Sequence, residues 1–269
     1  MSRIAHPQPL TPRERLGVRS FRGLMRAGVA SVKLQRKRTP AAVIQHRYGA
    51  HPDERLEFIE PRPGAPARAP VVYVHGGGWI SGKKELYTND LAFLADEGYP
   101  VFNLEYPLAP EHPHPNILLS LLSALQWIRD RHPEFQTMHL MGDSAGGNLA
   151  MMLAILTANP ERIHDLEQGH APRTPYPVSA ISLYGVLDRL SWIERGFPGA
   201  KVMLRSYGGD EAFEPEVGPE LAITPMDLTF ETLPPSFLLA GSADQLAESS
   251  RLCGEALQKS HERVETKVY

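Results

Sequence analysis

The segment 142–146 reads Gly-Asp-Ser-Ala-Gly, and it constrains the fold of this 269-residue chain more than any other stretch. It follows a short apolar run, 138–141, and opens a long apolar segment with helical spacing. A serine that attacks a carbonyl carbon must stand clear of the backbone, so its neighbours two positions away must be almost free of side chain. Gly142 and Gly146 meet that need, and the pattern therefore predicts a strand-to-helix turn that presents Ser144.

A second glycine-rich turn lies about seventy residues upstream. Residues 69–74 are typical of a buried strand, and they run into the sequence His-Gly-Gly-Gly-Trp at 75–79. Successive glycines at a strand end expose backbone N–H groups, and one such donor to the oxyanion of acyl transfer contributes roughly 3–4 kcal/mol. We predict an oxyanion hole formed by the amides of Gly77, Gly78 and Ala145. Nucleotide binding is not expected, because the loop is not followed by Gly-Lys-Ser/Thr and contains no G-x-G-x-x-G, the two glycine-rich motifs that bind phosphate.

Together these motifs resemble the hormone-sensitive-lipase-like α/β-hydrolases, bacterial esterases with an H-G-G-G loop and a G-D-S-A-G-G elbow. Segment 105–113 is similar to that family's E-Y-R-L-A-P-E-H-P segment, with Pro107 in place of the usual arginine. Segment 233–246 resembles the strand and loop that carry the acid of the triad. The resemblance covers roughly residues 40 to 269. It implies an α/β-hydrolase fold, with a mostly parallel central sheet, helices on both faces and a helical cap.

The activity that this resemblance implies is hydrolysis of short-chain acyl esters by a serine carboxylesterase, with Ser144 as nucleophile. Asp244 stands where the family carries its acid, and it follows an apolar strand, 237–240. Open α/β sheets place their sites at the carboxyl ends of such strands. The acid would orient a histidine and stabilise the imidazolium that forms. A solvated loop aspartate that begins the next helix is the alternative.

The sequence does not identify the general base of this triad. The family places its histidine just after the last strand, and the alternating segment 263–269, expected to be that strand, runs to Tyr269. His261 precedes the strand, about 20 Å from the catalytic face. His75 is expected to be structural, and His112 and His114 to lie in a Pro-rich loop at the rim of the site.

Three explanations for this gap stay open: a truncated gene, which is the simplest, a ligand-binding pseudoenzyme that kept the pocket, and a base donated by a partner chain. Without a base, only roughly 10³ to 10⁴-fold acceleration over water is expected from the oxyanion hole and binding. An amidase or formamidase of the same fold is a further alternative.

The composition excludes several other classes. The 28 basic and 31 acidic residues nearly balance, which argues against a nucleic-acid binder. No signal pattern and no apolar run of roughly eighteen residues is present, so we expect a cytoplasmic protein without a stable membrane anchor. No metal or cofactor is expected, because no histidine or cysteine cluster has ligand spacing. The single cysteine, Cys253, is predicted to be a packed small hydrophobe. The expected partner is a small-molecule ester, and a homo-oligomer is compatible with the sequence.

We expect one domain over residues 1–269, with two parts outside its strand and helix alternation. Residues 1–40 are predicted to form N-terminal cap helices, because the basic stretch 10–38 has one apolar helical face that needs a partner in water. A helix lying on an anionic membrane is the alternative. Residues 187–221 are predicted to complete the cap, although core packing alone would explain their bulky side chains. Strands are expected at 41–48, 55–60, 69–74, 100–104, 138–141, 178–184, 235–240 and 263–269, and helices at 86–97, 117–131, 145–158 and 247–259.

Overall fold

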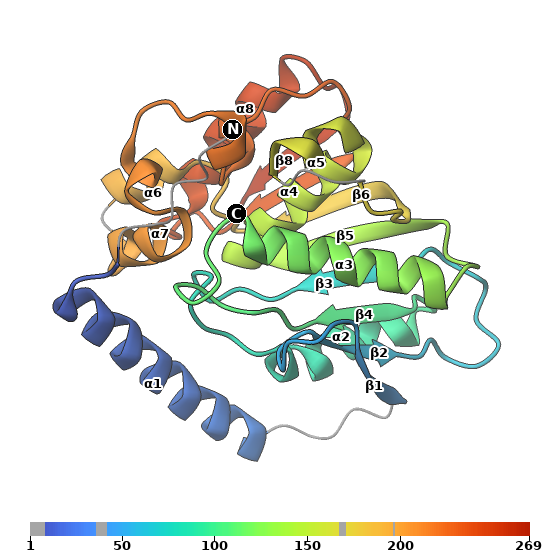
Figure 1. Cartoon of the computed structure of the whole chain (residues 1–269). Helices are drawn as coiled ribbons and strands as arrows, with labels where there is room; N and C mark the ends of the chain where they lie inside the picture. Colours follow the sequence, from blue (N-terminus) through green and yellow to red (C-terminus); the bar gives the residue numbers. More distant parts are fainter. Residues whose placement is uncertain (1–8, 36–41, 167–170, 196) are drawn as a thin grey trace.

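An eight-stranded sheet with helices on both faces forms the centre of the molecule (Figure 1). The computed structural model describes residues 9–35, 42–166, 171–195 and 197–269. The strand order is β1-β2-β4-β3-β5-β6-β7-β8. β2 pairs antiparallel with both β1 and β4, and every other pairing is parallel. The predicted fold class, a mostly parallel α/β sheet, is confirmed.

The eight strands and the helices α2, α3, α4 and α8 follow the expected order and lie close to the expected bounds, whereas α5 was not expected. The strands are β1 Val43–Arg47, β2 Arg55–Ile59, β3 Val71–Val74, β4 Val101–Leu104, β5 Thr137–Asp143, β6 Tyr176–Leu183, β7 Ser236–Ala240 and β8 Val264–Val268. The helices are α1 Pro12–Gln35, α2 Thr88–Asp96, α3 Asn116–Arg131, α4 Ala145–Ala158, α5 Ile163–Leu166, α6 Arg189–Glu194, α7 Ala200–Gly208 and α8 Ala247–Gln258. Short 3₁₀ turns are η1 Lys84–Leu86, η2 Pro160–Arg162, η3 Asp210–Phe213, η4 Pro219–Leu221 and η5 Pro225–Asp227.

The helix expected at 86–97 differs at its start, because η1 precedes α2. Lys84 is buried there, and its ammonium lies 3.1 Å from a carboxylate oxygen of Glu57. Its amide donates to Glu105, 3.2 Å away. These fixed contacts hold the segment in a tight 3₁₀ turn, and the α-helix begins only after it.

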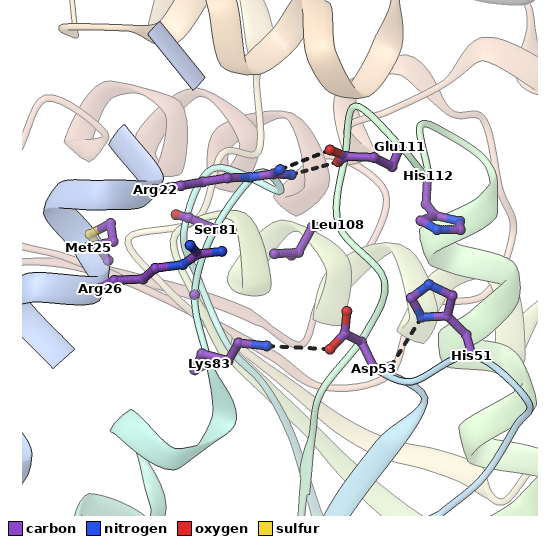
Figure 2. Close-up of a pocket in the computed structure, with 11 residues that line it drawn as sticks. Arg22, Met25, Arg26, His51, Asp53, Ser81, Lys83, Leu108, Glu111 and His112 are labelled. Atoms are coloured by element: carbon purple, nitrogen blue, oxygen red, sulfur yellow. Dashed lines mark hydrogen bonds and ion pairs between the residues drawn. The ribbon is translucent and has the colours of Figure 1, made fainter. Parts of the chain in front are cut away.

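α1 lies along the outside of the molecule and contacts α7 (Figure 1). The Arg22 guanidinium donates to the carbonyls of Ile80 and Ala109. It also donates to both carboxylate oxygens of Glu111 (Figure 2). One side chain therefore ties α1 to the segment after β3 and to the Pro-rich segment after β4. The cap role of residues 1–40 stays a prediction, and residues 1–8 and 36–40 lie outside the described chain.

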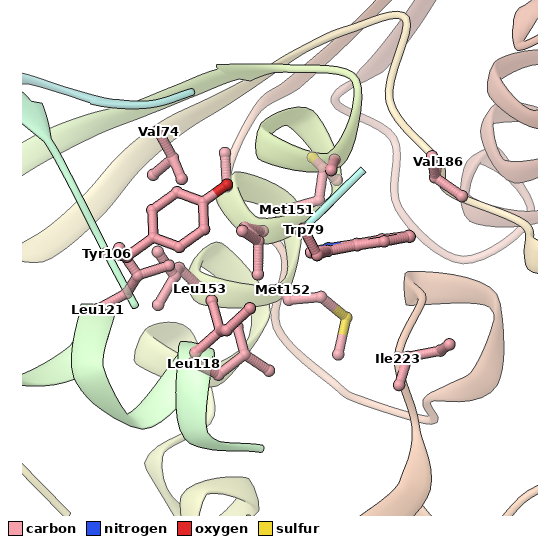
Figure 3. Close-up of a cluster of buried hydrophobic side chains, with 14 of the residues drawn as sticks. Val74, Trp79, Tyr106, Leu118, Leu121, Met151, Met152, Leu153, Val186 and Ile223 are labelled. Carbon is pink, nitrogen blue, oxygen red and sulfur yellow. The ribbon is translucent and has the colours of Figure 1, made fainter. Parts of the chain in front are cut away.

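The hydrophobic core has two parts, one on each face of the sheet, and successive side chains of β3 point alternately into one part and the other. Val72 and Val74 belong to the larger cluster with α3 and α4, whereas Val71 and Tyr73 pack with α2. Figure 3 shows side chains of β3, α3 and α4 in contact in the larger cluster. α4 is buried from Ala145 to Thr157, as expected for a helix that is apolar on all sides.

Cys253 of α8 is fully buried, so its predicted packing role is confirmed. Burial, and then the nearby Asp188 carboxylate, raise the pKa of its thiol to about 12.

The segment 187–221 packs against the residues that follow β3. The Trp79 ring stacks on Tyr207, with centroids 4.7 Å apart, and meets Trp192 edge-on at 5.9 Å. Met203 lies against Gly78, because a Cβ on that glycine would be 2.4 Å from the Met203 sulfur. Core packing therefore accounts for Trp192, Met203 and Tyr207, and the cap role of the segment stays a prediction.

His114 should give the stability of this protein a measurable pH dependence. Burial lowers the pKa of His114 from 6.5 to about 4, although its hydrogen bond with the Glu220 carbonyl opposes the shift. As pH falls, the unfolded chain therefore takes up this proton first. The contribution of neutral His114 to the free energy of unfolding is complete above pH 6.5. It declines toward pH 4 by up to about 3 kcal/mol. Urea unfolding of the His114→Gln variant should show a flatter profile over this range.

The matched control is His164→Gln, because His164 is exposed and should leave the slope unchanged. A His114→Gln slope equal to that of the wild type would show that His114 is not held neutral by burial.

Candidate active site

Ser144 sits on a sharp turn between β5 and α4, with φ 51° and ψ −121°. Positive φ is uncommon for a residue with a side chain, and such backbone strain costs about 1–3 kcal/mol. The surrounding backbone holds the turn, since the Ser144 amide donates to Leu183 at 2.8 Å and its carbonyl accepts from Asn148 at 3.0 Å. The predicted strand-to-helix turn at Ser144 is therefore present.

Glycine is required on both sides of Ser144. A Cβ on Gly142 would lie 2.3 Å from the Gly146 carbonyl oxygen, and one on Gly146 would lie 2.1 Å from the Val74 carbonyl oxygen. Both obstacles are backbone atoms, which cannot rotate away. The missing side chains let the start of α4 touch the end of β3.

The glycine loop, residues 75–79, leaves the same edge of the sheet as the turn at Ser144. β3 and β5 are parallel neighbours, with Val74 opposite Gly142. Gly77 and Gly78 have φ of 127° and 61°, which explains why glycine stands there. Within the described chain their amides donate to no protein acceptor. Ala145 is the first residue of α4, so its amide also has no partner within the helix.

Asp143 fastens this loop to the turn. Its buried carboxylate accepts from the Gly76 amide and the Tyr73 hydroxyl at 2.8 Å each, and from the Tyr87 hydroxyl at 2.9 Å. Burial, and then the charge of Asp143, raise the pKa of both phenols well above the usual value, so both remain donors. The sequence indicates no role for Asp143, because its partners come from two segments, 73–76 and the start of α2, that lie far from it along the chain.

His75 and Glu105 form a fully buried pair behind the loop. The His75 Nδ1 lies 2.8 Å from the Gly76 carbonyl oxygen, and its Nε2 lies 3.3 Å from the Glu105 carboxylate. Both ring nitrogens are therefore engaged, Nδ1 with a carbonyl oxygen, which can only accept, and Nε2 with a carboxylate. Burial lowers the pKa of His75, but Glu105 outweighs it and the net shift is upward. His75 thus has no free ring nitrogen with which to contact Ser144.

Asp244 follows β7 at the same edge of the sheet, with β6 between β7 and β5. Its Oδ1 accepts from the Leu246 amide at 2.8 Å, so it also orders the start of α8. Tyr184, at the end of β6, has a pKa raised to about 12 by burial, then by Asp143 and Asp244. Asp244 lines a cavity of about 300 Å³ with Arg195, Gln245, Glu248 and neighbouring residues of its loop. The two predicted site residues, Ser144 and Asp244, lie at the same edge of the sheet, and among the described residues no hydrogen bond joins their side chains.

The other candidate histidines lie in separate surroundings. His112 packs edge-on against His51 at 4.6 Å, and His114 is buried beside Tyr207. His261 stacks on Phe230 and precedes β8, so it lies at the amino end of that strand, as predicted. Among the residues described, no histidine nitrogen hydrogen-bonds to Ser144 or Asp244.

The carboxyl end of β8 lies beside the loop that carries Asp244. The Tyr269 amide donates to the Ala240 carbonyl at 3.0 Å, and the Tyr269 carbonyl accepts from the Ser242 amide. Tyr269 is therefore hydrogen-bonded to Ser242, which precedes Asp244 by two positions in the chain.

The described ranges contain no group of three His, Cys, Asp or Glu side chains placed to hold a metal ion. None of the helices in these ranges combines the length and the apolar character needed to cross a membrane.

The chain belongs to the alpha/beta hydrolase fold family, whose model matches residues 71–269. It is 26% identical over 179 residues to the esterase LipC of Mycobacterium tuberculosis, covering 60% of this chain and 43% of that protein. It is 38% identical over 112 residues to the hormone-sensitive lipase of Mus musculus, covering 39% of this chain and 14% of that protein. The resemblance to hormone-sensitive-lipase-like esterases is confirmed, and the chain spans less than half the length of both proteins.

A solved structure, esterase B from Lactobacillus rhamnosis, superposes with a TM-score of 0.80. The alignment covers 96% of this chain and 85% of that one at 23% identity, and it supports the shared fold.

Proposed function

We propose that this chain carries the catalytic core of a serine carboxylesterase that acts on short-chain acyl esters. Ser144 is the nucleophile, Asp244 is the acid, and the amides of Gly77, Gly78 and Ala145 bind the oxyanion. The observation that carries the proposal is the strained turn at Ser144 with the glycine loop fastened to it by Asp143. The relatives named esterase and lipase support the same reaction class.

In the proposed reaction the Ser144 hydroxyl oxygen attacks the ester carbonyl carbon while a base takes its proton. The carbonyl oxygen becomes an oxyanion and, in this proposal, accepts from the amides of Gly77, Gly78 and Ala145. The intermediate then expels the alcohol, which takes the proton from the base, and an acyl-Ser144 ester remains. Water attacks this ester in the same way and releases the carboxylic acid.

The base is proposed to come from outside the described surroundings of Ser144. Both ring nitrogens of His75 are engaged with other partners, and within the described ranges no other histidine hydrogen-bonds to the serine. A histidine placed a few residues beyond Tyr269 in a longer chain would enter beside Asp244. A partner chain could also donate it. The same observation favours a second candidate function, a ligand-binding protein without turnover.

Hydrolysis of a short-chain aryl ester tests these alternatives. The chain as given, its Ser144→Ala variant and a chain extended by the downstream genomic sequence should be compared. The proposal predicts weak turnover by the chain as given and a large gain on extension, which Ser144→Ala removes. Efficient turnover that survives Ser144→Ala would refute the nucleophile assignment. Saturable ligand binding with no turnover in either chain would favour the binding protein.

A further inference from the structure

A second cavity, of about 250 Å³, lies where α1 meets the body of the molecule. α1, the turn between β1 and β2, the segment after the glycine loop and the Pro-rich segment all line it. None of Ser144, Asp244, Gly77 and Gly78 is among its lining residues. This cavity is therefore separate from the proposed catalytic groups.

The charged side chains around this cavity do not cancel. Glu111 is fully engaged by Arg22, which bonds both of its carboxylate oxygens at 2.9 and 2.7 Å. Asp53 has only long contacts, with Lys83 at 3.4 Å and Arg55 at 3.7 Å. Two carboxylates thus face three cationic side chains of the lining, Arg22, Arg26 and Lys83.

Arg26 is the cation left over. Within the described chain no carboxylate or carbonyl accepts from its guanidinium, and Figure 2 shows that group turned toward the middle of the cavity. Lys83 also lines the cavity, and its ammonium has donor capacity left by the long contacts to Asp53 and, at 3.6 Å, to Glu105. A guanidinium and an ammonium facing one space suit an oxyanion, because each supplies charge-assisted hydrogen bonds.

The remaining wall limits the size and character of the ligand. Met25 and Leu108 offer apolar contact beside the cations. A volume of about 250 Å³ admits a small molecule but no polymer.

We propose that this cavity binds a small organic anion, whose carboxylate or phosphate group lies between Arg26 and Lys83 and whose short apolar part contacts Met25 and Leu108. This anion site is distinct from the groups proposed to hydrolyse the ester, and the proposal does not depend on their assignment.

Occupancy of this site reaches the glycine loop through Ser81 and Gly82, which line the cavity. The Ser81 amide and hydroxyl donate to the Gly77 carbonyl at 3.1 and 2.8 Å. Gly82 packs on His75, since a Cβ there would lie 2.5 Å from the ring nitrogen. An anion that immobilises this segment should slow hydrogen exchange at the Ser81 amide.

Titration calorimetry at constant ionic strength tests the proposal with sodium butyrate and with inorganic phosphate, and butyramide serves as the neutral analogue of butyrate. We expect saturable binding of an anion, no binding of butyramide, and at least tenfold weaker binding by Arg26→Gln and by Lys83→Gln. Binding of butyrate alone would identify a carboxylate ligand with an apolar part. Binding of both anions would identify the charged group as sufficient.

The matched control is Arg19→Gln, which removes an exposed charge of α1 that does not line the cavity. Circular dichroism of each variant checks that it is folded. The proposal is overturned if neither anion saturates, if butyramide binds equally well, or if Arg19→Gln weakens binding as much as Arg26→Gln does.

Discussion

Replacing Gly146 with alanine is expected to destabilise the protein by about 3 kcal/mol and to remove Ser144-dependent turnover. The new Cβ would lie 2.1 Å from the Val74 carbonyl oxygen and 2.5 Å from that of His75. Because both atoms belong to the backbone, α4 and β3 must move apart. A shift of about 1 Å at a reacting group is enough to lower turnover about a hundredfold. Urea unfolding measures the loss of stability. Hydrolysis of a short-chain aryl ester, by the chain extended with the downstream genomic sequence, measures the loss of turnover.

The matched control for this substitution is Gly17→Ala in α1. A Cβ there meets nothing within 4 Å, and alanine raises helix propensity by about 1 kcal/mol. This variant should be as stable as the wild type or slightly more stable. If Gly146→Ala is as stable toward urea as Gly17→Ala, the start of α4 and the end of β3 do not approach one another closely enough to require glycine at position 146.

Replacing Asp143 with alanine is expected to have the second large effect. The substitution leaves the Gly76 amide and the Tyr73 and Tyr87 hydroxyls without their acceptor in the protein interior. A buried donor without a partner costs about 1–3 kcal/mol, so a loss of about 3 kcal/mol or more in the free energy of unfolding is expected. The glycine loop should also loosen, which hydrogen exchange at the Gly76 amide would report as faster exchange.

Two further variants separate the loop contact from general destabilisation. Tyr73→Phe removes one donor to Asp143 but keeps the Gly76 contact, so it should lose only about 1 kcal/mol and leave exchange at Gly76 unchanged. Asp143→Asn keeps one carbonyl acceptor and should fall between Tyr73→Phe and Asp143→Ala. Unchanged Gly76 exchange in Asp143→Ala would contradict the role of Asp143 in holding the loop.

The fold was predictable because each of its signals is local. Glycine at 142 and 146, the apolar run before them and the apolar helix after them are properties of adjacent residues, and α4 begins and ends where expected. The glycine loop was found for the same reason. Its φ values demand glycine at 77 and 78.

The contacts that hold the site together could not be predicted in this way. Asp143 meets Tyr73, Gly76 and Tyr87 only after β3 and β5 pair, and no spacing in the sequence reports that pairing. The cavity under α1 could not be predicted from the sequence either, since Arg26 and Lys83 come to line one cavity only through tertiary packing. Asp244 was found through the family resemblance, and its catalytic role stays a prediction.

The hydrogen bonds that hold the glycine loop to the buried side chains of Asp143 and Glu105 have a consequence for how rate and stability are related. Asp143 and Glu105 fix the loop during folding, so the dipoles of the proposed oxyanion hole are oriented before any ester arrives. In water, solvent dipoles would have to reorient around the oxyanion in every reaction. Here the free-energy cost of orienting the amide dipoles is part of the free energy of folding. A variant that makes this loop more pliable should therefore raise the activation barrier even where its global unfolding temperature hardly changes.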